Sequence, residues 1–242
     1  MPGRSLPVVG HGLWIGVAPH IGRHVGDPTR AWQMLAPKQT HVTLPLEQFV
    51  SPGPQPPGTV RFVCVSDTHG SSPLRSVPDG DVLLHAGDWS QLGGLSEVSK
   101  FCSWIKAQPH KRKIVIAGNH DLLMDRGNLD ELARRFGLVR GEIPEGELER
   151  MHLAAKELLD SACEYLCDSG TEVEGIQIWG SPWQPWFCDW AFNLPRGKPC
   201  RDKWKLIPTE TDVLITHGPA LGHGDLCSSH QRAGCLDLLD EV

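Results

Sequence analysis

The stretch Arg61-Phe62-Val63-Cys64-Val65-Ser66-Asp67-Thr68-His69 joins a short apolar run to two side chains that commonly bind metals. The run from Val60 to Val65 is rich in β-branched residues and is bounded by turn residues, which predicts a buried strand. Asp67 and His69 follow at its carboxyl end. Because residues i and i+2 share a face of an extended chain, we expect both side chains on the same side.

Three further segments place polar residues directly after an apolar run. They are Ala86-Gly87-Asp88, Ala117-Gly118-Asn119-His120-Asp121 and Thr216-His217-Gly218. The runs before them predict strands, and one more strand is predicted elsewhere, which gives Val82 to Ala86, Lys113 to Ala117, Gly175 to Trp179 and Val213 to Thr216.

Apolar residues at helical spacing predict helices at 95–105, 129–136 and 148–159. Strands that alternate with helices indicate an α/β fold with a largely parallel sheet. The binding crevice of such a sheet opens at the carboxyl ends of the strands. All four polar segments lie at those ends, so we expect their side chains to converge.

Carboxylate, imidazole and amide groups are suitable ligands for divalent cations, and two cations about 3.5 to 4 Å apart promote attack of water on a phosphoester. We predict that Asp88 bridges two metals. Asp67 and His69 would complete one metal site, and Asn119 and His217 the other. Asn119 is also expected to contact the substrate.

His120 follows the predicted ligand Asn119 and is expected to point to the other side of the local backbone. An imidazole in that place would face the leaving group rather than the metals. We therefore predict that His120 is the general acid.

The composition limits the classes of partner and location. A chain of 242 residues with 40% hydrophobic residues can form one globular core. The net charge of −6 and the scattered Lys and Arg residues argue against binding to polymeric nucleic acid. No apolar run is long enough to span a membrane, and we expect no signal peptide. The eight cysteines form no Cys-x-x-Cys pair, which favours reduced thiols and a cytoplasmic location.

The chain divides into two predicted regions. Residues 1–58 are rich in Gly, Pro and His and end in a proline-rich run, which indicates an N-terminal arm without helix or strand. Pro19 and Gly22 in particular are expected to prevent a helix. Residues 59–242 would form the catalytic domain.

The Asp-x-His, Gly-Asp, Gly-Asn-His-Asp and later His-Gly motifs together resemble those of the calcineurin-like metallophosphoesterase superfamily. The stretches at 61–69, 113–120 and 181–187 are similar to its branch of metallophosphoesterase-domain-containing proteins, and the resemblance covers about residues 60 to 242. It implies an αββα sandwich and a dinuclear site that holds manganese or iron, with zinc as the alternative. It also implies hydrolysis of phosphodiesters, with small nucleotides such as cyclic nucleoside monophosphates as candidate substrates. The roles of the family transfer to Asp67, His69, Asp88, Asn119, His120 and His217.

The sequence departs from the superfamily pattern in two places. The superfamily has a Gly-His-x-His segment on a later strand, and none occurs here before Val242. We therefore expect a C-terminally truncated domain that lacks its final strands and has reduced activity. In addition, many relatives have an acid three residues after the bridging Asp, where this chain has Gln91. We expect the Gln91 amide oxygen to accept a hydrogen bond from His120 without offsetting its charge, so that Gln91→Glu would raise turnover.

Several residues have alternative interpretations. The candidate ligands could act only as caps and turn formers. His85 is predicted to be a hydrogen-bonded histidine of the core, and His110 and His152 to be surface residues. Trp183, Trp186 and Phe187 would either stack on a nucleobase or pack among themselves.

Two other functions compete with hydrolysis of small phosphodiesters. One is a catalytically weak or inactive protein that binds a nucleotide or a metal, and the other is a phosphoprotein phosphatase. Manganese-dependent hydrolysis that is lost in Asp88→Asn would distinguish an enzyme from a binding protein.

Overall fold

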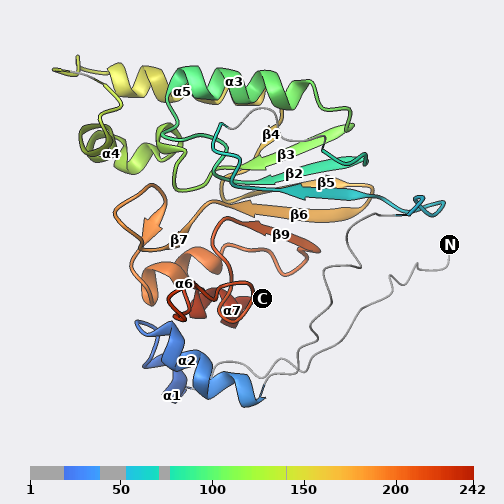
Figure 1. The fold of residues 1–242 in the computed structure, drawn as a ribbon, viewed down its shortest axis with the longest axis vertical. Coiled ribbons are helices and arrows are strands. Elements are labelled where there is room, and N and C mark those ends of the chain that lie inside the picture. Colours follow the sequence, from blue (N-terminus) through green and yellow to red (C-terminus); the bar gives the residue numbers. More distant parts are fainter. Residues whose placement is uncertain (1–18, 39–52, 71–76, 140) are drawn as a thin grey trace.

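The computed structural model describes residues 19–38, 53–70, 77–139 and 141–242. Its first sheet contains β1, β2, β3 and β4 in chain order, and every neighbouring pair is parallel. These strands span Phe62–Val65, Val82–Ala86, Arg112–Ile116 and Glu164–Tyr165. Parallel strands in chain order place all their carboxyl ends at one edge of the sheet (Figure 1).

The second sheet has the order β5, β6 and β9. β5 (Ser169–Val173) and β6 (Ile176–Ser181) form an antiparallel hairpin, and β9 (Val213–Thr216) is parallel to β6. The hairpin loop has only two residues, Glu174 and Gly175, with φ angles of 52° and 83°. Two positive φ angles are what a tight hairpin loop requires, which explains the glycine. A short parallel pair, β7 (Gln184–Pro185) and β8 (Asn193–Leu194), lies beside the sandwich.

The two sheets pack face to face, and successive residues of β2 serve the two sides of the first sheet. Leu83 is in the core beneath the helices, whereas Val82 and Leu84 pack toward Ile178 and Ile215 of the second sheet. A strand that is buried on both faces has a sequence of consecutive apolar residues. This accounts for the close match between the predicted and observed bounds of β2.

Helices cover the outer face of each sheet (Figure 1). α3 (Leu95–Lys106) and α5 (Glu147–Asp160) lie on the first sheet, with α4 (Leu129–Phe136) and the short 3₁₀ helices η3 (Leu122–Met124) and η4 (Arg126–Asn128) at one end. α6 (Lys198–Trp204) and α7 (Leu236–Glu241) share a core with Leu214 of β9. The predicted αββα sandwich is therefore confirmed.

The part of the N-terminal region that the structure describes is helical. α1 (Pro19–Gly22), α2 (Pro28–Leu35) and η1 (Ala36–Lys38) follow one another, so the prediction that Pro19 and Gly22 would prevent a helix is wrong. The Asp27 side chain accepts a hydrogen bond of 2.9 Å from the Arg30 backbone nitrogen, and Pro28 occupies the first turn. An Asp cap followed by Pro is a favourable helix start.

The α2 helix is held by the C-terminal part of the chain. Its residues Ala31 and Leu35 share a core with Leu221, Leu236 and Leu239. The remainder of the predicted arm, residues 1–18 and 39–52, lies outside the described residues, and the division of the chain at residue 58 stays a prediction. None of the helices in the described ranges combines the length and hydrophobicity needed to cross a bilayer.

Candidate metal centre

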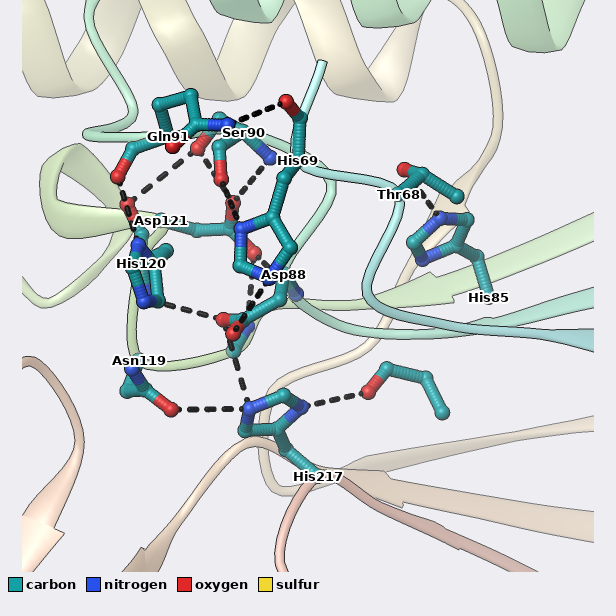
Figure 2. A network of polar contacts seen from close by, with 12 residues as sticks. Thr68, His69, His85, Asp88, Ser90, Gln91, Asn119, His120, Asp121 and His217 are labelled. Atoms are coloured by element: carbon teal, nitrogen blue, oxygen red, sulfur yellow. Dashed lines mark hydrogen bonds and ion pairs between the residues drawn. The ribbon is translucent and has the colours of Figure 1, made fainter. Parts of the chain in front are cut away.

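The polar segments converge where the strands of both sheets end. Gly87 lies directly after β2, and its carbonyl oxygen accepts a hydrogen bond of 3.0 Å from the Asp67 backbone nitrogen. From the second sheet, the His217 ring nitrogen Nδ1 lies 2.9 Å from the Ala86 carbonyl oxygen. Figure 2 shows His69, Asp88, Asn119 and His217 around one small volume.

The backbone at this edge is not extended. Asp67, His69 and Asp88 have φ angles of 54°, 44° and 55°. The expectation that Asp67 and His69 share a side of an extended chain therefore fails, although their side chains still reach Asp88. Non-glycine residues rarely adopt left-handed φ angles, and those that do are concentrated at functional sites. Hydrogen bonds from the backbone nitrogens of Asp67 and His69 to Gly87 and Asp88 hold this conformation.

Two glycines allow the segments to approach closely. Gly87 has a φ angle of 93°, and a Cβ atom there would lie 2.7 Å from the Ala117 carbonyl oxygen. A Cβ atom on Gly118 would lie 2.5 Å from the Asp88 backbone nitrogen. The Gly-Asp and Gly-Asn-His motifs therefore need glycine because the two loops touch through their backbones.

Asp88 lies at the centre of two groups of candidate ligands. One group contains Asp67, Asp88 and His217, and the other contains His69, Asp88 and His120. Within each group, the ligand atoms lie within 4.8 Å of one another. Asp88 alone belongs to both, which is the position expected of a bridging carboxylate. The geometry groups Asp67 with His217, and the predicted partition of ligands between the two metals stays a prediction.

His217 presents one ring nitrogen to the acidic cluster. With Nδ1 directed at the Ala86 carbonyl oxygen, Nε2 lies 3.4 Å from Asp88 Oδ1 and 3.0 Å from Asn119 Oδ1. Burial opposes the charged imidazole, but contact with the Asp88 carboxylate outweighs it and raises the pKa of His217 to about 9. A carbonyl partner on the far nitrogen is the usual way in which a protein orients a histidine ligand.

The pKa of the Asp88 carboxyl group is shifted by its burial and by its neighbours. Burial would raise the pKa of Asp88, but contact with His217 and the hydrogen bond from the His120 backbone nitrogen hold it below its ordinary value. Asp88 is therefore ionised at neutral pH. Carboxylate oxygens, imidazole nitrogens and an amide oxygen in one small volume are suitable ligands for divalent metal ions.

His69 and His120 are both oriented by backbone carbonyl groups. His69 Nδ1 lies 3.2 Å from the Ser90 carbonyl oxygen, and its Nε2 lies 3.7 Å from Asp88 Oδ2. His120 Nδ1 lies 2.8 Å from the Gln91 carbonyl oxygen. The two rings meet edge to face with centroids 4.6 Å apart.

The side chain of Gln91 does not have the predicted contact. Its amide nitrogen donates a hydrogen bond of 2.9 Å to the His69 carbonyl oxygen, and the backbone oxygen of Gln91 serves His120 instead. The prediction that the amide oxygen orients His120 is therefore wrong. The reason is that the Asp88 loop turns back on itself and already presents a carbonyl group to the ring.

Asp121 supports the loops that carry the candidate ligands. It is fully buried, and its carboxylate accepts hydrogen bonds from the backbone nitrogens of Asp88, Ser90 and Gly118 and from the Ser90 hydroxyl. Burial raises the pKa of Asp121 to about 7, and the charge of Asp88 adds to the effect. Its place in the Gly-Asn-His-Asp motif was the available signal.

Three further histidines, His85, His110 and His152, lie in buried positions. His85 is fully buried, and its Nε2 lies 3.1 Å from the Thr68 hydroxyl, so the prediction of a core histidine is confirmed. Burial lowers the pKa of His85 to about 3, which keeps the ring neutral. His110 and His152 are buried against the carbonyl oxygens of Pro78 and Leu123, so their predicted surface positions are wrong.

The aromatic residues between β6 and β8 differ in their burial and contacts. Trp183 packs edge to face against Phe192, and its Nε1 donates to Asp168, so it is a structural residue. Trp186 and Phe187 are 57% and 60% exposed. Exposed neighbouring rings remain free to contact a ligand.

Known proteins are similar to this chain over most of its length. Residues 60–240 match the family described as calcineurin-like phosphoesterase. The human protein named metallophosphoesterase domain-containing protein 1 is 43% identical over 227 residues, which cover 92% of this chain and 69% of the relative. The mouse protein of that name has the same identity and coverage. UPF0046 protein T07D4.2 of Caenorhabditis elegans is 40% identical over 229 residues, or 92% of this chain and 57% of the relative. The chain therefore belongs to the calcineurin-like phosphoesterase family, whose members are metal-dependent phosphoester hydrolases.

Proposed function

We propose that this chain is a phosphodiesterase that hydrolyses small nucleotide-type substrates with two divalent metals, manganese or iron being preferred. The observation that carries the proposal is the position of Asp88 between two candidate histidine ligands. Its Oδ2 lies 3.7 Å from His69 Nε2, and its Oδ1 lies 3.4 Å from His217 Nε2. When bound, the metals would supply a nucleophilic hydroxide and neutralise charge on the phosphoryl oxygens.

The protein residues have distinct tasks in this reaction. The metals would be held by Asp67, His69, Asp88, Asn119 and His217, and the Asn119 amide would also contact the phosphoryl group. His120 donates the proton from Nε2 to the leaving oxygen, since Nδ1 is engaged by the Gln91 carbonyl group. Asp121 and the glycines fix the loops that carry these groups.

Reduced activity is part of the proposal. The five predicted ligands would give each metal few protein contacts, and this would limit turnover. We also propose the cytoplasm as its location, because all eight cysteines are free thiols. Its partner would be a small-molecule phosphodiester rather than polymeric nucleic acid.

The test is hydrolysis of bis(p-nitrophenyl) phosphate by the chain supplied with manganese. We expect metal-dependent turnover that falls at least about a hundredfold in Asp88→Asn, as for other losses of a metal ligand or its support. The matched control is Asp160→Asn, at an exposed residue that pairs with Lys156 on α5. Manganese binding without turnover in the unmodified chain would favour the alternative, a binding protein.

The nucleotide preference is supported by the exposed Trp186 and Phe187. Their loop reaches the site, because the Ala191 backbone nitrogen donates a hydrogen bond of 3.2 Å to the Asn119 carbonyl oxygen. Aromatic faces stack on nucleobases at about 1 to 3 kcal/mol for each base. We expect Trp186→Ala to raise KM for a cyclic nucleoside monophosphate about tenfold and to leave KM for bis(p-nitrophenyl) phosphate within about threefold.

A further inference from the structure

A row of stacked rings backs the side chain of His120. Trp190 stacks on His120 with ring centroids 4.0 Å apart and an interplanar angle of 27°. Phe136 of α4 also stacks on Trp190, with centroids 4.1 Å apart and an angle of 29°. The rings of His69 and His120 meet nearly at right angles, with centroids 4.6 Å apart. The ring of His120 therefore contacts two other rings, and only Trp190 stacks flat on it among the described residues.

The segment that carries Trp190 is fastened to the segment that carries His120. The Trp190 backbone nitrogen donates to the Phe187 carbonyl oxygen, and the next residue, Ala191, donates to the Asn119 carbonyl oxygen. The Phe192 backbone nitrogen then donates a hydrogen bond of 2.8 Å to the Asp125 carboxylate. Ala191 and Phe192 are almost fully buried. These anchors fix the tryptophan ring relative to the histidine.

The hydrogen bond of His120 does not by itself define its ring. A single hydrogen bond, from Nδ1 to the Gln91 carbonyl oxygen, is a weak restraint on rotation about the Cα–Cβ and Cβ–Cγ bonds of the side chain (Figure 2). The flat contact with Trp190 and the nearly perpendicular ring of His69 restrict that rotation further. Proton transfer is sensitive to such alignment, because the donor must lie within hydrogen-bonding reach of the leaving oxygen.

We propose that Trp190 is a positioning residue that aligns His120 Nε2 with the leaving oxygen of the substrate. The inference rests on the proposed function, in which His120 is the general acid. Trp190 itself takes no part in bond making. Its removal should therefore weaken only reactions whose leaving group needs a proton.

The experiment compares bis(p-nitrophenyl) phosphate with diphenyl phosphate, in the manganese-loaded full chain. p-Nitrophenolate is stable enough to leave without a proton, whereas phenolate gains much more from protonation. We expect Trp190→Leu to lower kcat for diphenyl phosphate at least about tenfold, and for the nitro compound less than about threefold, because general acids contribute about 10²- to 10⁴-fold. Trp190→Phe keeps a stacking ring and should restore most of the rate. Loss on both substrates to the same degree, or on neither, would overturn the proposal.

Two further variants separate the possible failures. Trp179→Leu is the matched control, because Trp179 is a half-buried tryptophan of β6 beside Gly170, away from the site, and both rates should stay unchanged. His120→Ala tests the proton donor directly. If His120→Ala loses both substrates equally, the general acid role fails and the inference falls with it. His120→Ala could instead lower the rate only for diphenyl phosphate while neither Trp190 variant does so. Only the role of Trp190 is then refuted. Circular dichroism and thermal unfolding identify a variant that fails to fold, and Trp190→Phe then carries the test.

Discussion

The buried carboxylate of Asp121 accepts a hydrogen bond of 2.9 Å from the backbone nitrogen of Asp88. The same oxygen accepts a hydrogen bond of 2.7 Å from the Gly118 backbone nitrogen. One atom therefore joins the loops after β2 and β3, which carry the central carboxylate and the Asn119-His120 pair. The position of Asp88 depends on this acceptor as much as on its own backbone.

Asp121→Asn is expected to weaken both the fold and the metal site. An amide group can replace only one of the two carboxylate oxygens as acceptor, so buried N–H groups lose their partners at about 1 to 3 kcal/mol each. We expect a loss of about 2 to 4 kcal/mol in the free energy of unfolding and about 10- to 100-fold in manganese affinity. Urea unfolding and isothermal titration with manganese measure the two effects. Ser90→Ala removes a single hydroxyl donor and should cost less in both, and unchanged affinity in Asp121→Asn would contradict the role.

Gly87→Ala should be far more harmful than Gly70→Ala. Both glycines have positive φ angles, of 93° and 64°. At Gly87 an added Cβ would also lie 2.7 Å from the Ala117 carbonyl oxygen, whereas at Gly70 it would meet no atom of the described residues within 4 Å. We therefore expect about 1 kcal/mol of destabilisation at Gly70 and about 3 kcal/mol or more at Gly87. Equal melting temperatures for the two variants would show that the close contact of the loops is not important.

The strands that carry the site could be predicted from local sequence because they are buried. β2 (Val82–Ala86) and β9 (Val213–Thr216) have the predicted bounds, and each is a short apolar run that ends at polar residues. β5 (Ser169–Val173) was not predicted, because its residues Ser169, Gly170 and Glu172 have little strand preference. Its pairing with β6 and its two-residue turn hold it in the sheet.

The candidate ligand side chains could be identified from the sequence, but the backbone groups that orient them could not. Motif spacing identified Asp88 and His217 without any knowledge of their contacts. The Ala86, Ser90 and Gln91 carbonyl oxygens that orient the histidines are backbone atoms, which exist at every position and give no sequence signal. Which of them face a ring is decided by the left-handed turns and by contact between loops. The start of α2 was a readable signal that the composition of the region obscured, since Asp27 and Pro28 form a favourable cap.

Gln91→Glu is now expected to lower turnover, which reverses the expectation from sequence. The Gln91 amide nitrogen donates to the His69 carbonyl oxygen, and a carboxylate in its place would face that oxygen without a hydrogen. Gln91→Ala also loses the donor but adds no repulsion. We expect kcat/KM to fall in the order unmodified, Gln91→Ala, Gln91→Glu, with bis(p-nitrophenyl) phosphate as substrate. Higher turnover in Gln91→Glu would restore the interpretation in which an acid steadies charged His120.

Stability in mild acid should depend on an ion pair far from the site. The Arg112 guanidinium of β3 donates to both oxygens of Glu164 on β4, and it also donates to the Thr171 hydroxyl and the Glu172 carbonyl oxygen of β5. It thereby ties the first sheet to the second. The hydrogen bond from Arg112 lowers the pKa of Glu164, although partial burial opposes the shift.

The sign of the pH effect follows from this lowered pKa. Because the folded protein holds the Glu164 proton less tightly than the unfolded chain, the pair stabilises the fold above the ordinary glutamate pKa. That contribution is lost as the pH falls through the lowered pKa of Glu164, which lies below the ordinary glutamate value. We expect Glu164→Gln to cost about 1 kcal/mol or less at pH 7, since the pair is partly exposed, and progressively less as the pH is lowered through that pKa. Urea unfolding across this range measures the difference, with Asp160→Asn as the control for an exposed pair within one helix. A difference that stays constant with pH would mean that Glu164 acts through shape rather than charge.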